Sequence, residues 1–465
     1  MTDAEEIRAV APYSGIRLIE FRIERLFDEF DYTIPLSIVN HVTAIIAPNG
    51  TGKTLCLRMI AALFEHKWSV FADNIFSKIL YKFTEGTTVE IDKKLAADDS
   101  NPSSSENRLS LRIVIRNSNG ELIDEWSPRL GNPRHFMQVE RYVPFLTRIG
   151  QNVWRHDNTG ESYNIAEVIE AFGDSFPEPI RANLFGRTSE TLTAITSQID
   201  CHLIETQRLL ILRDEGDEIH YRNTRRPPST LAIARKAEAL KSIISQQINV
   251  YATLSQSLDR SFPRRVISHP TTLPSEELKA QLQDLDQKRK ELMDAGILDT
   301  ETDDPVSLPE GTLEAAMARV LSVYADDTRR KLASLADLLA KIKLFKELID
   351  ERFITKDVRI TRQNGIEVIF KDRKIPIERL SSGEQHQLVL FFELLFEIKQ
   401  NALILIDEPE LSLHVAWQKK FISDLMKIID LNRFDVILAT HSPQLIGRWV
   451  DLVVELGDVY EGHSR

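Results

Sequence analysis

Residues 47–54, APNGTGKT, lie between an apolar run that is typical of a buried strand and an apolar pattern that predicts a helix from Lys53. Gly50 and Gly52 allow the backbone to turn so that successive N–H groups point at phosphate oxygens, and the helix amino terminus adds its positive dipole. A strand, a glycine loop and a helix in this order distinguish a phosphate-binding loop from a chance match. The segment therefore predicts a nucleotide site.

Different residues of the loop are expected to bind different parts of a magnesium nucleotide. The ammonium of Lys53 is expected to reach the β- and γ-phosphates, and the hydroxyl of Thr54 to bind Mg²⁺. One position departs from the usual G-x-x-x-x-G-K-[ST] pattern, because Ala47 stands where the first glycine is common. The predicted nucleotide-binding residues of the loop are Asn49, Gly50, Thr51, Gly52, Lys53 and Thr54.

Two later apolar runs end in polar residues that suit the same site. NALILIDEPELSLH predicts a strand that ends at Asp407 and Glu408, and adjacent carboxylates there are costly unless a cation lies near. Asp407 is expected to orient Mg²⁺, while Glu408 accepts a proton from, or orients, the water that attacks the γ-phosphate. FDVILATHSPQLIG predicts a second such strand, which places His441 beside the same phosphate.

The segment LSSGEQ opens another apolar helix and offers a second anion-binding end at Ser381, Ser382 and Gly383. The chain already has one phosphate loop for its own nucleotide. The second end is therefore expected to meet a nucleotide held by another copy of the molecule.

The composition limits the classes of protein that the chain can belong to. No apolar run approaches the roughly 20 residues that cross a bilayer, and the amino terminus lacks an export signal, so we expect a cytoplasmic protein without a membrane partner. Two cysteines make neither a disulfide framework nor a zinc site. A net charge of −12 argues against a surface that is basic all over, although it leaves room for a local nucleic-acid groove.

The middle of the chain, from about residue 226 to 353, has helical periodicity. Leu321, Thr328, Leu335, Ile342 and Ile349 recur every seventh residue, and proline-containing segments, SFPRR among them, are expected to separate short antiparallel helices. The favoured interpretation of the basic clusters is a solvated helix face, because Asp326 and Asp327 are interleaved, and direct DNA binding is the alternative. The basic residues are Arg222, Arg225, Arg226, Arg264, Arg265, Arg329, Arg330 and Lys331.

APNGTGKT, LSSGEQ, LILIDEPELSLH and ATHSPQ, in this order, resemble the ATP-binding-cassette heads of SMC-like ATPases. The resemblance implies an α/β fold, an ABC-type P-loop head with a mixed sheet and flanking helices, interrupted by an antiparallel coiled-coil insert. It divides the chain into 1–225, 226–353 and 354–465, with the outer parts forming the head. It also implies ATP and Mg²⁺ as cofactors, slow or regulated ATP hydrolysis, and a head-to-head dimer or a higher even oligomer.

The same resemblance requires a glutamine after a strand, where it touches Mg²⁺ and the attacking water. Gln207 in IETQRL is preferred, and Gln138 in FMQVERY is the competitor. Gln207, Glu408 and His441 are therefore the expected catalytic residues. Thr54, Gln207 and Asp407 are the residues expected to bind Mg²⁺.

Among SMC-like ATPases, the chain most resembles the compact heads of bacterial anti-phage systems. Related nucleases of the overcoming-lysogenisation-defect family carry a Toprim domain after the head, and about two dozen residues follow His441 here. IETQRL, LSSGEQ and DEPELSLH are most similar to the PtuA family of the Septu system, whose separately encoded partner is an HNH nuclease. The resemblance thus implies an ATPase without its own nuclease that scaffolds such an effector. A PARIS-type sensor ATPase and a DNA-repair or DNA-tethering ATPase are the alternatives.

Overall fold

The structure is a computed structural model, and its described residues form two compact units that we treat separately. The first unit contains residues 1–206, 399–411 and 418–465, and the second contains 207–398 and 412–417. The expected three-part division of the sequence stays a prediction. The described residues are 15–93, 111–128, 142–143, 145–150, 153–157, 160, 162–164, 168, 172, 176, 188–204, 210–212, 229–268, 274–299 and 314–457.

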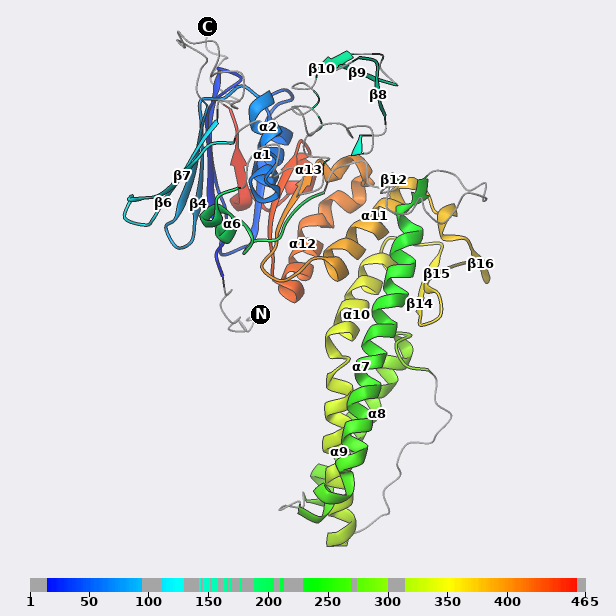
Figure 1. The fold of residues 1–465 in the computed structure, drawn as a ribbon. Coiled ribbons are helices and arrows are strands. Elements are labelled where there is room, and N and C mark those ends of the chain that lie inside the picture. Colours follow the sequence, from blue (N-terminus) through cyan, green and yellow to red (C-terminus); the bar gives the residue numbers. More distant parts are fainter. Residues whose placement is uncertain are drawn as a thin grey trace, which may run out of the picture. The chain divides into compact units, whose positions relative to one another are not determined.

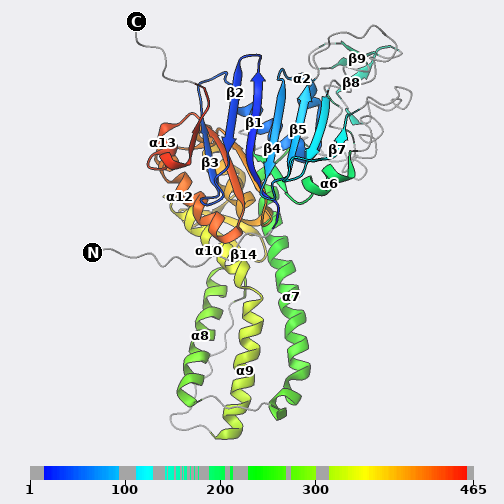
Figure 2. The ribbon, with the colours of Figure 1, turned by 90° about the vertical axis from the view of Figure 1, so that its left-hand side faces the viewer.

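The first unit contains an antiparallel sheet with the strand order β2-β1-β4-β5-β6-β7 (Figure 2). Apolar side chains alternate along its strands, so that Phe21 and Ile23 are buried while Arg22 between them is exposed. The turn at Asn119 and Gly120 joins the last two strands, as predicted. The strands are β1 (Leu18–Leu26), β2 (Phe30–Pro35), β4 (Lys78–Phe83), β5 (Thr88–Lys93), β6 (Leu111–Arg116) and β7 (Leu122–Trp126).

A parallel sheet with the strand order β11-β17-β18-β3-β19 carries the predicted nucleotide-binding strands. Its central strands are apolar except at their ends and almost wholly buried, because both of their faces are covered, which is typical of parallel sheets. Strands β17 and β3 both flank β18, so their carboxyl ends meet at one edge. The strands are β3 (Val42–Ile46), β11 (Cys201–Ile204), β17 (Leu403–Asp407), β18 (Asp435–Thr440) and β19 (Val453–Glu455).

Helix α1 (Lys53–Glu65) connects the cores of the two sheets (Figure 1). It packs on β11, β17 and β18, and the hydroxyl of Tyr81 in the antiparallel sheet donates a 2.8 Å hydrogen bond to the carbonyl of Met59. The helix is therefore fixed by both sheets. The remaining elements of this unit are α2 (Trp68–Asp73), β8 (Leu146–Arg148), β9 (Val153–His156), β10 (Ser162–Asn164), α6 (Glu190–Thr196), α12 (Val415–Asn432, from Gln418 onward), α13 (Pro443–Ile446) and 3₁₀ turns at Pro409–Ser412 and Val450–Leu452.

The second unit contains the predicted helical insert, and its helices form an extended bundle (Figures 1 and 2). Helix α7 runs antiparallel to α9 and α10, because Gln247 bonds to Ser334 whereas Arg265, further along α7, bonds to Asp327. Within the described residues, no helix is both long and apolar enough to cross a bilayer. The helices are α7 (Ala232–Ser268), α8 (Ser275–Asp294), α9 (Ala315–Ala333) and α10 (Ala336–Asp350).

Helix α8 runs in the same direction as α9 and α10. Its residue Gln281 accepts a hydrogen bond from Arg329, and Glu291 near its end pairs with Lys343 further along the chain. The antiparallel insert thus also contains a parallel pair of helices, which the heptad pattern alone did not indicate.

The expected break at SFPRR is wrong, because Pro263 lies inside α7, which continues to Ser268. Proline removes one backbone hydrogen bond from a helix interior. Here the last turn is stabilised by Arg265, whose guanidinium donates to the carbonyl of Leu258 at 2.7 Å and to Asp327 on α9 at 2.6 Å. Tertiary contacts therefore outweigh the local helix-breaking effect of the proline.

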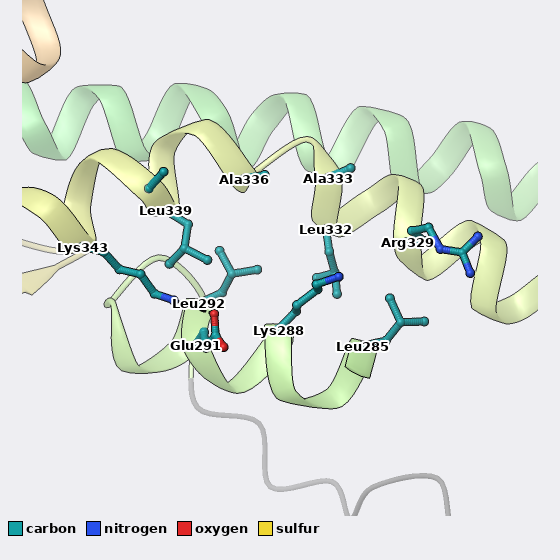
Figure 3. Close-up of a pocket in the computed structure, with 11 residues that line it drawn as sticks. Leu285, Lys288, Glu291, Leu292, Arg329, Leu332, Ala333, Ala336, Leu339 and Lys343 are labelled. Carbon is teal, nitrogen blue, oxygen red and sulfur yellow. Dashed lines mark hydrogen bonds and ion pairs between the residues drawn. The ribbon is translucent and has the colours of Figure 1, made fainter. Parts of the chain in front are cut away.

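A groove of about 340 Å³ lies between α8 and the α9–α10 pair (Figure 3). Leu285, Leu292, Leu332 and Leu339 line it together with alanines near the break between α9 and α10. The basic residues at this groove have acidic partners within the bundle, as in the 2.5 Å pair of Lys343 with Glu291.

A small antiparallel sheet, β14-β15-β16, packs on α7 and α10 in the second unit. Its first hairpin turns at Asn364 and Gly365, as predicted. The chain then enters the helix that LSSGEQ opens. These elements are β12 (Leu210–Leu212), β13 (Ser229–Leu231), β14 (Asp357–Thr361), β15 (Gly365–Phe370), β16 (Arg373–Ile375), a 3₁₀ turn (Ile377–Arg379), α11 (Ser382–Phe392) and a π-helical turn (Glu393–Glu397).

Candidate nucleotide-binding site

The predicted phosphate loop follows β3 and opens α1. Gly50 and Gly52 have φ angles of 83° and 91°, which glycine adopts without strain. A Cβ on Gly52 would lie 2.7 Å from a terminal methyl group of Leu26, so the loop packs closely on the end of β1. A Cβ on Gly50 would meet nothing within 4 Å, so the loop is open on that side.

Two hydrogen bonds hold the outer part of the loop. The hydroxyl of Thr51 donates to the carbonyl of Pro48 at 2.8 Å, and the hydroxyl of Tyr32 donates to the carbonyl of Thr51 at 3.0 Å. Burial raises the pKa of Tyr32 to about 12, so the phenol stays protonated and remains a donor at neutral pH. These bonds within the chain hold the loop in its shape.

The side chain of Lys53 is buried and lies within the loop. Its Nζ donates to the carbonyls of Ala47 and Pro48 at 2.8 and 2.9 Å. Burial lowers the pKa of Lys53, while the nearby carboxylates of Glu408 and Asp407 act in the opposite direction. A buried ammonium held by loop carbonyls at the start of a helix is suited to bind phosphate oxygens.

Thr54 and Asp407 lie together although 353 residues separate them. The hydroxyl of Thr54 is 3.1 and 3.0 Å from the two carboxylate oxygens of Asp407. Asp407 ends β17, a strand that contacts α1, and only 8% of its surface is exposed. A hydroxyl and a carboxylate are oxygen ligands of the kind that Mg²⁺ prefers.

Glu408 and His441 follow two neighbouring parallel strands, β17 and β18. Glu408 has a φ of 45°, and its N–H donates to the carbonyl of Ala439 at 2.9 Å. His441 Nε2 lies 3.7 Å from Glu408 Oε1, and its Nδ1 lies 3.5 Å from Nζ of Lys53. The sheet therefore brings together the four groups that the sequence placed at this site, namely Lys53, Asp407, Glu408 and His441.

Glu410 also lies at this site, although the sequence pattern did not indicate it. Its Oε1 accepts a 2.6 Å hydrogen bond from the backbone N–H of His441. Its charge also acts to raise the pKa of Lys53, against the lowering that burial causes. The only sequence signal is a third acid shortly after the Asp407-Glu408 pair, in a turn whose direction the sequence does not reveal.

Ser381, Ser382 and Gly383 lie in the second unit, at the start of α11. Ser381 is the N-cap residue, and its hydroxyl lies 2.8 Å from a carboxylate oxygen of Glu384. That carboxylate also accepts from the backbone N–H of Ser381 at 2.8 Å, which completes a capping box. The side chains of Ser381 and Ser382 are exposed, whereas Lys356 holds Glu384 from the other side at 2.6 and 2.7 Å.

Gln207 and its competitor Gln138 both lie outside the described residues. Their assignment stays a prediction. The basic residues Arg222, Arg225 and Arg226 also lie outside the described residues.

The residues present fit a magnesium nucleotide. The shaped glycine loop, the buried ammonium of Lys53 and the oxygen pair of Thr54 and Asp407 suit polyphosphate and its cation. When bound, the magnesium nucleotide would supply the transferable γ-phosphoryl group and the charge that offsets the clustered carboxylates. The chain would hold an ammonium, a hydroxyl, carboxylates and an imidazole in fixed positions around it.

A comparison with known protein families identifies an ATPase. The sequence model of the AAA ATPase domain family matches residues 27–446. No curated protein matches the chain.

Solved SMC head domains are similar over nearly the whole chain, at low identity. An Smc head from Pyrococcus furiosus, bound to the C-terminal domain of ScpA, is 13% identical, with 95% of this chain and 93% of that one covered and a TM-score of 0.33. The SMC head from Thermotoga maritima is 12% identical, with 94% of each chain covered and a TM-score of 0.31. An Smc head from Pyrococcus yayanosii is 13% identical, with 95% of each chain covered and a TM-score of 0.32.

Proposed function

Because the chain belongs to the AAA ATPase domain family, we propose that it binds and slowly hydrolyses Mg-ATP as an SMC-like switch that controls a separately encoded effector. The observation that carries this proposal is the meeting of Lys53, the Thr54–Asp407 pair, Glu408 and His441 at one edge of the parallel sheet. These groups come from three distant parts of the sequence. Their convergence is the arrangement that phosphoryl transfer to water requires.

The residues have separate roles in this proposal. Lys53 and the loop residues 49–52 bind the phosphates, and Thr54 and Asp407 hold Mg²⁺. Glu408 orients or deprotonates the attacking water, and His441 lies beside it to hold the γ-phosphate. Gln207 is proposed to contact the metal and the water.

The start of α11 supports the proposed assembly of two or more copies. Ser381 and Ser382 are exposed at a capped helix amino terminus in the described part of the chain, and Gly383 follows them. We assign these three residues to a nucleotide held by a second copy, which gives a head-to-head dimer or a higher even oligomer.

The effector is proposed to be a nuclease, with the HNH nuclease of Septu-type anti-phage systems as the preferred class. This step rests on the resemblance of IETQRL, LSSGEQ and DEPELSLH to Septu ATPases. A PARIS-type sensor scaffold is the alternative within defence systems. Direct DNA tethering is less favoured, because Arg265 and Arg329 are engaged by Asp327 and Asp326 within the insert.

The test is the mass of the purified chain by light scattering, with and without Mg-ATP and with the protein encoded beside it. A Glu408→Gln variant should accumulate the ATP-bound assembly, and Lys53→Ala should lose ATP binding and assembly. Lys82→Ala, an exposed lysine on β4, is the matched control. A wild-type chain that remains a monomer with or without nucleotide and neighbour would contradict the switch. Salt-sensitive DNA binding without a protein partner would instead favour DNA tethering.

A further inference from the structure

Glu410 links the ends of two neighbouring strands. It lies in the 3₁₀ turn Pro409–Ser412 after β17, and its Oε1 accepts the backbone N–H of His441 after β18 at 2.6 Å. A hydrogen bond to an ionised acceptor is roughly twice as strong as one between neutral groups. This bond fixes the point from which the imidazole of His441 extends.

A second route joins the same two segments through Gln418 on α12. The side-chain amide of Gln418 donates to the carbonyl of Glu410 at 3.4 Å, and its Oε1 accepts from the hydroxyl of Ser442 at 2.7 Å. Ser442 in turn caps the turn that follows, since its Oγ accepts the N–H of Leu445 at 3.3 Å. Both the backbone and the side chain of Glu410 therefore connect to residues 441–442.

The other carboxylate oxygen of Glu410, Oε2, is buried and has no hydrogen-bond partner within the described part of the chain. Burying an unpartnered polar atom is unfavourable. A residue that served only to fill space would avoid this cost with an apolar side chain. The bond that Oε1 accepts from His441 is thus a reason for an acceptor oxygen at this position.

We propose that Glu410 is a positioning residue for ATP hydrolysis, which acts by holding His441 next to Lys53 and Glu408. The imidazole that it positions lies 3.5 Å from Nζ of Lys53 and 3.7 Å from Oε1 of Glu408. The proposal rests on the proposed ATPase site. A displacement of His441 would disturb catalysis more than ATP binding, because the phosphate loop holds the nucleotide independently.

The charge of Glu410 offers a competing explanation, since it also acts on Lys53. Two variants separate the explanations. Glu410→Gln removes the charge and keeps an acceptor oxygen at the same length, while Glu410→Asp keeps the charge and withdraws the acceptor by one methylene. Glu85→Gln, an exposed residue of the first unit, is the control.

If Glu410 acts through the hydrogen bond, Glu410→Asp lowers kcat about 10-fold or more with the KM for ATP within about threefold, and Glu410→Gln retains most of kcat. Adding Glu410→Asp to a His441→Ala background should cause no further loss. A larger loss of kcat in Glu410→Gln than in Glu410→Asp would overturn the proposal. Additive losses of kcat when Glu410→Asp is combined with His441→Ala would also overturn it. An Asp variant that no longer binds labelled ATP would also count against it.

Hydrogen exchange at the His441 amide provides a readout independent of activity. The amide should exchange slowly in the wild-type chain and in Glu410→Gln, and faster in Glu410→Asp. If the wild-type chain hydrolyses no ATP but the His441 amide exchanges faster only in Glu410→Asp, the proposed function fails, while the hydrogen bond between Glu410 and His441 is supported. If all three chains exchange alike, the link itself is absent.

Discussion

The hydroxyl of Thr54 lies 3.1 and 3.0 Å from the two carboxylate oxygens of Asp407, so that the first turn of α1 meets the end of β17. We expect a Thr54→Val variant, which loses this oxygen, to require at least about 10-fold more Mg²⁺ for half-maximal ATP hydrolysis. A magnesium titration of ATPase activity measures the change. Thr33→Val, at an exposed position of β2, should leave the titration unaltered. An unchanged titration for Thr54→Val would remove this hydroxyl from the metal site.

The ion pair of Lys356 with Glu384 gives a prediction about pH and stability. Burial acts to raise the pKa of Glu384, but hydrogen bonds from Lys356 and Ser381 reverse this and leave the pKa lowered. A carboxyl whose pKa is lower in the folded state stabilises the fold above the pKa of the unfolded chain. That contribution disappears as the pH falls through the lowered pKa of the folded state.

We therefore expect Glu384→Gln to reduce the free energy of unfolding of the second unit at pH 7 by about 1–2 kcal/mol, and much less near pH 3. Urea unfolding at both pH values tests this. Glu238→Gln, at an exposed surface pair on α7, should change the free energy by less than about 0.5 kcal/mol at either pH. A loss that is equal at both pH values would show that the charge of Glu384 is not the cause.

The helical insert contains a buried and an exposed ion pair side by side, which allows a direct comparison. Asp327 on α9 is only 4% exposed and is held by Arg265, whereas the side chains of Asp326 and its partner Arg329 are 41% and 48% exposed. Arg265→Met leaves a buried carboxylate without its partner, and we expect a loss of about 3 kcal/mol in the free energy of unfolding. Arg329→Met should cost less than about 1 kcal/mol. Similar losses in both variants would contradict the burial argument.

The sequence predicted which residues lie together at the candidate site where the pattern is local or follows from strand order, and their roles stay predictions. The phosphate loop needs only Gly50, Gly52 and Lys53 in close succession, and Asp407 and His441 follow apolar strands that a parallel sheet aligns. The contact of Glu410 with His441 was not predictable in the same way. It depends on which way one turn directs a side chain after the strand has ended.

Contacts between elements explain the other differences. Pro263 indicated a helix end, but Arg265 stabilises the next turn through a residue 62 positions away. Lys356 precedes the segment LSSGEQ by a whole hairpin, so its pairing with Glu384 required the fold of β14 to β16. In each case the sequence supplied the residue type, and only the packing of distant elements supplied its partner.

Two Asn-Gly turns look alike in the sequence and differ in their surroundings, which leads to the last prediction. Gly120 and Gly365 have φ angles of 80° and 67°, so alanine is strained at both positions. A Cβ on Gly120 would meet nothing within 4 Å, whereas one on Gly365 would lie 1.9 Å from the carbonyl oxygen of Ala237 on α7. The hairpin at Gly365 therefore touches the backbone of α7 in a way that no side chain permits.

We expect Gly120→Ala to lower the free energy of unfolding of the first unit by about 1–2 kcal/mol, the cost of a left-handed alanine. Gly365→Ala should cost the second unit about 3 kcal/mol or more, because α7 and the β14–β15 hairpin must move apart as well. Urea unfolding of each variant, with hydrogen exchange to assign the loss to a unit, measures the difference. Equal losses would mean that the hairpin does not contact α7 in solution. A larger loss at Gly365 would show that the same local turn signal can have different energetic consequences according to the helix that packs against it.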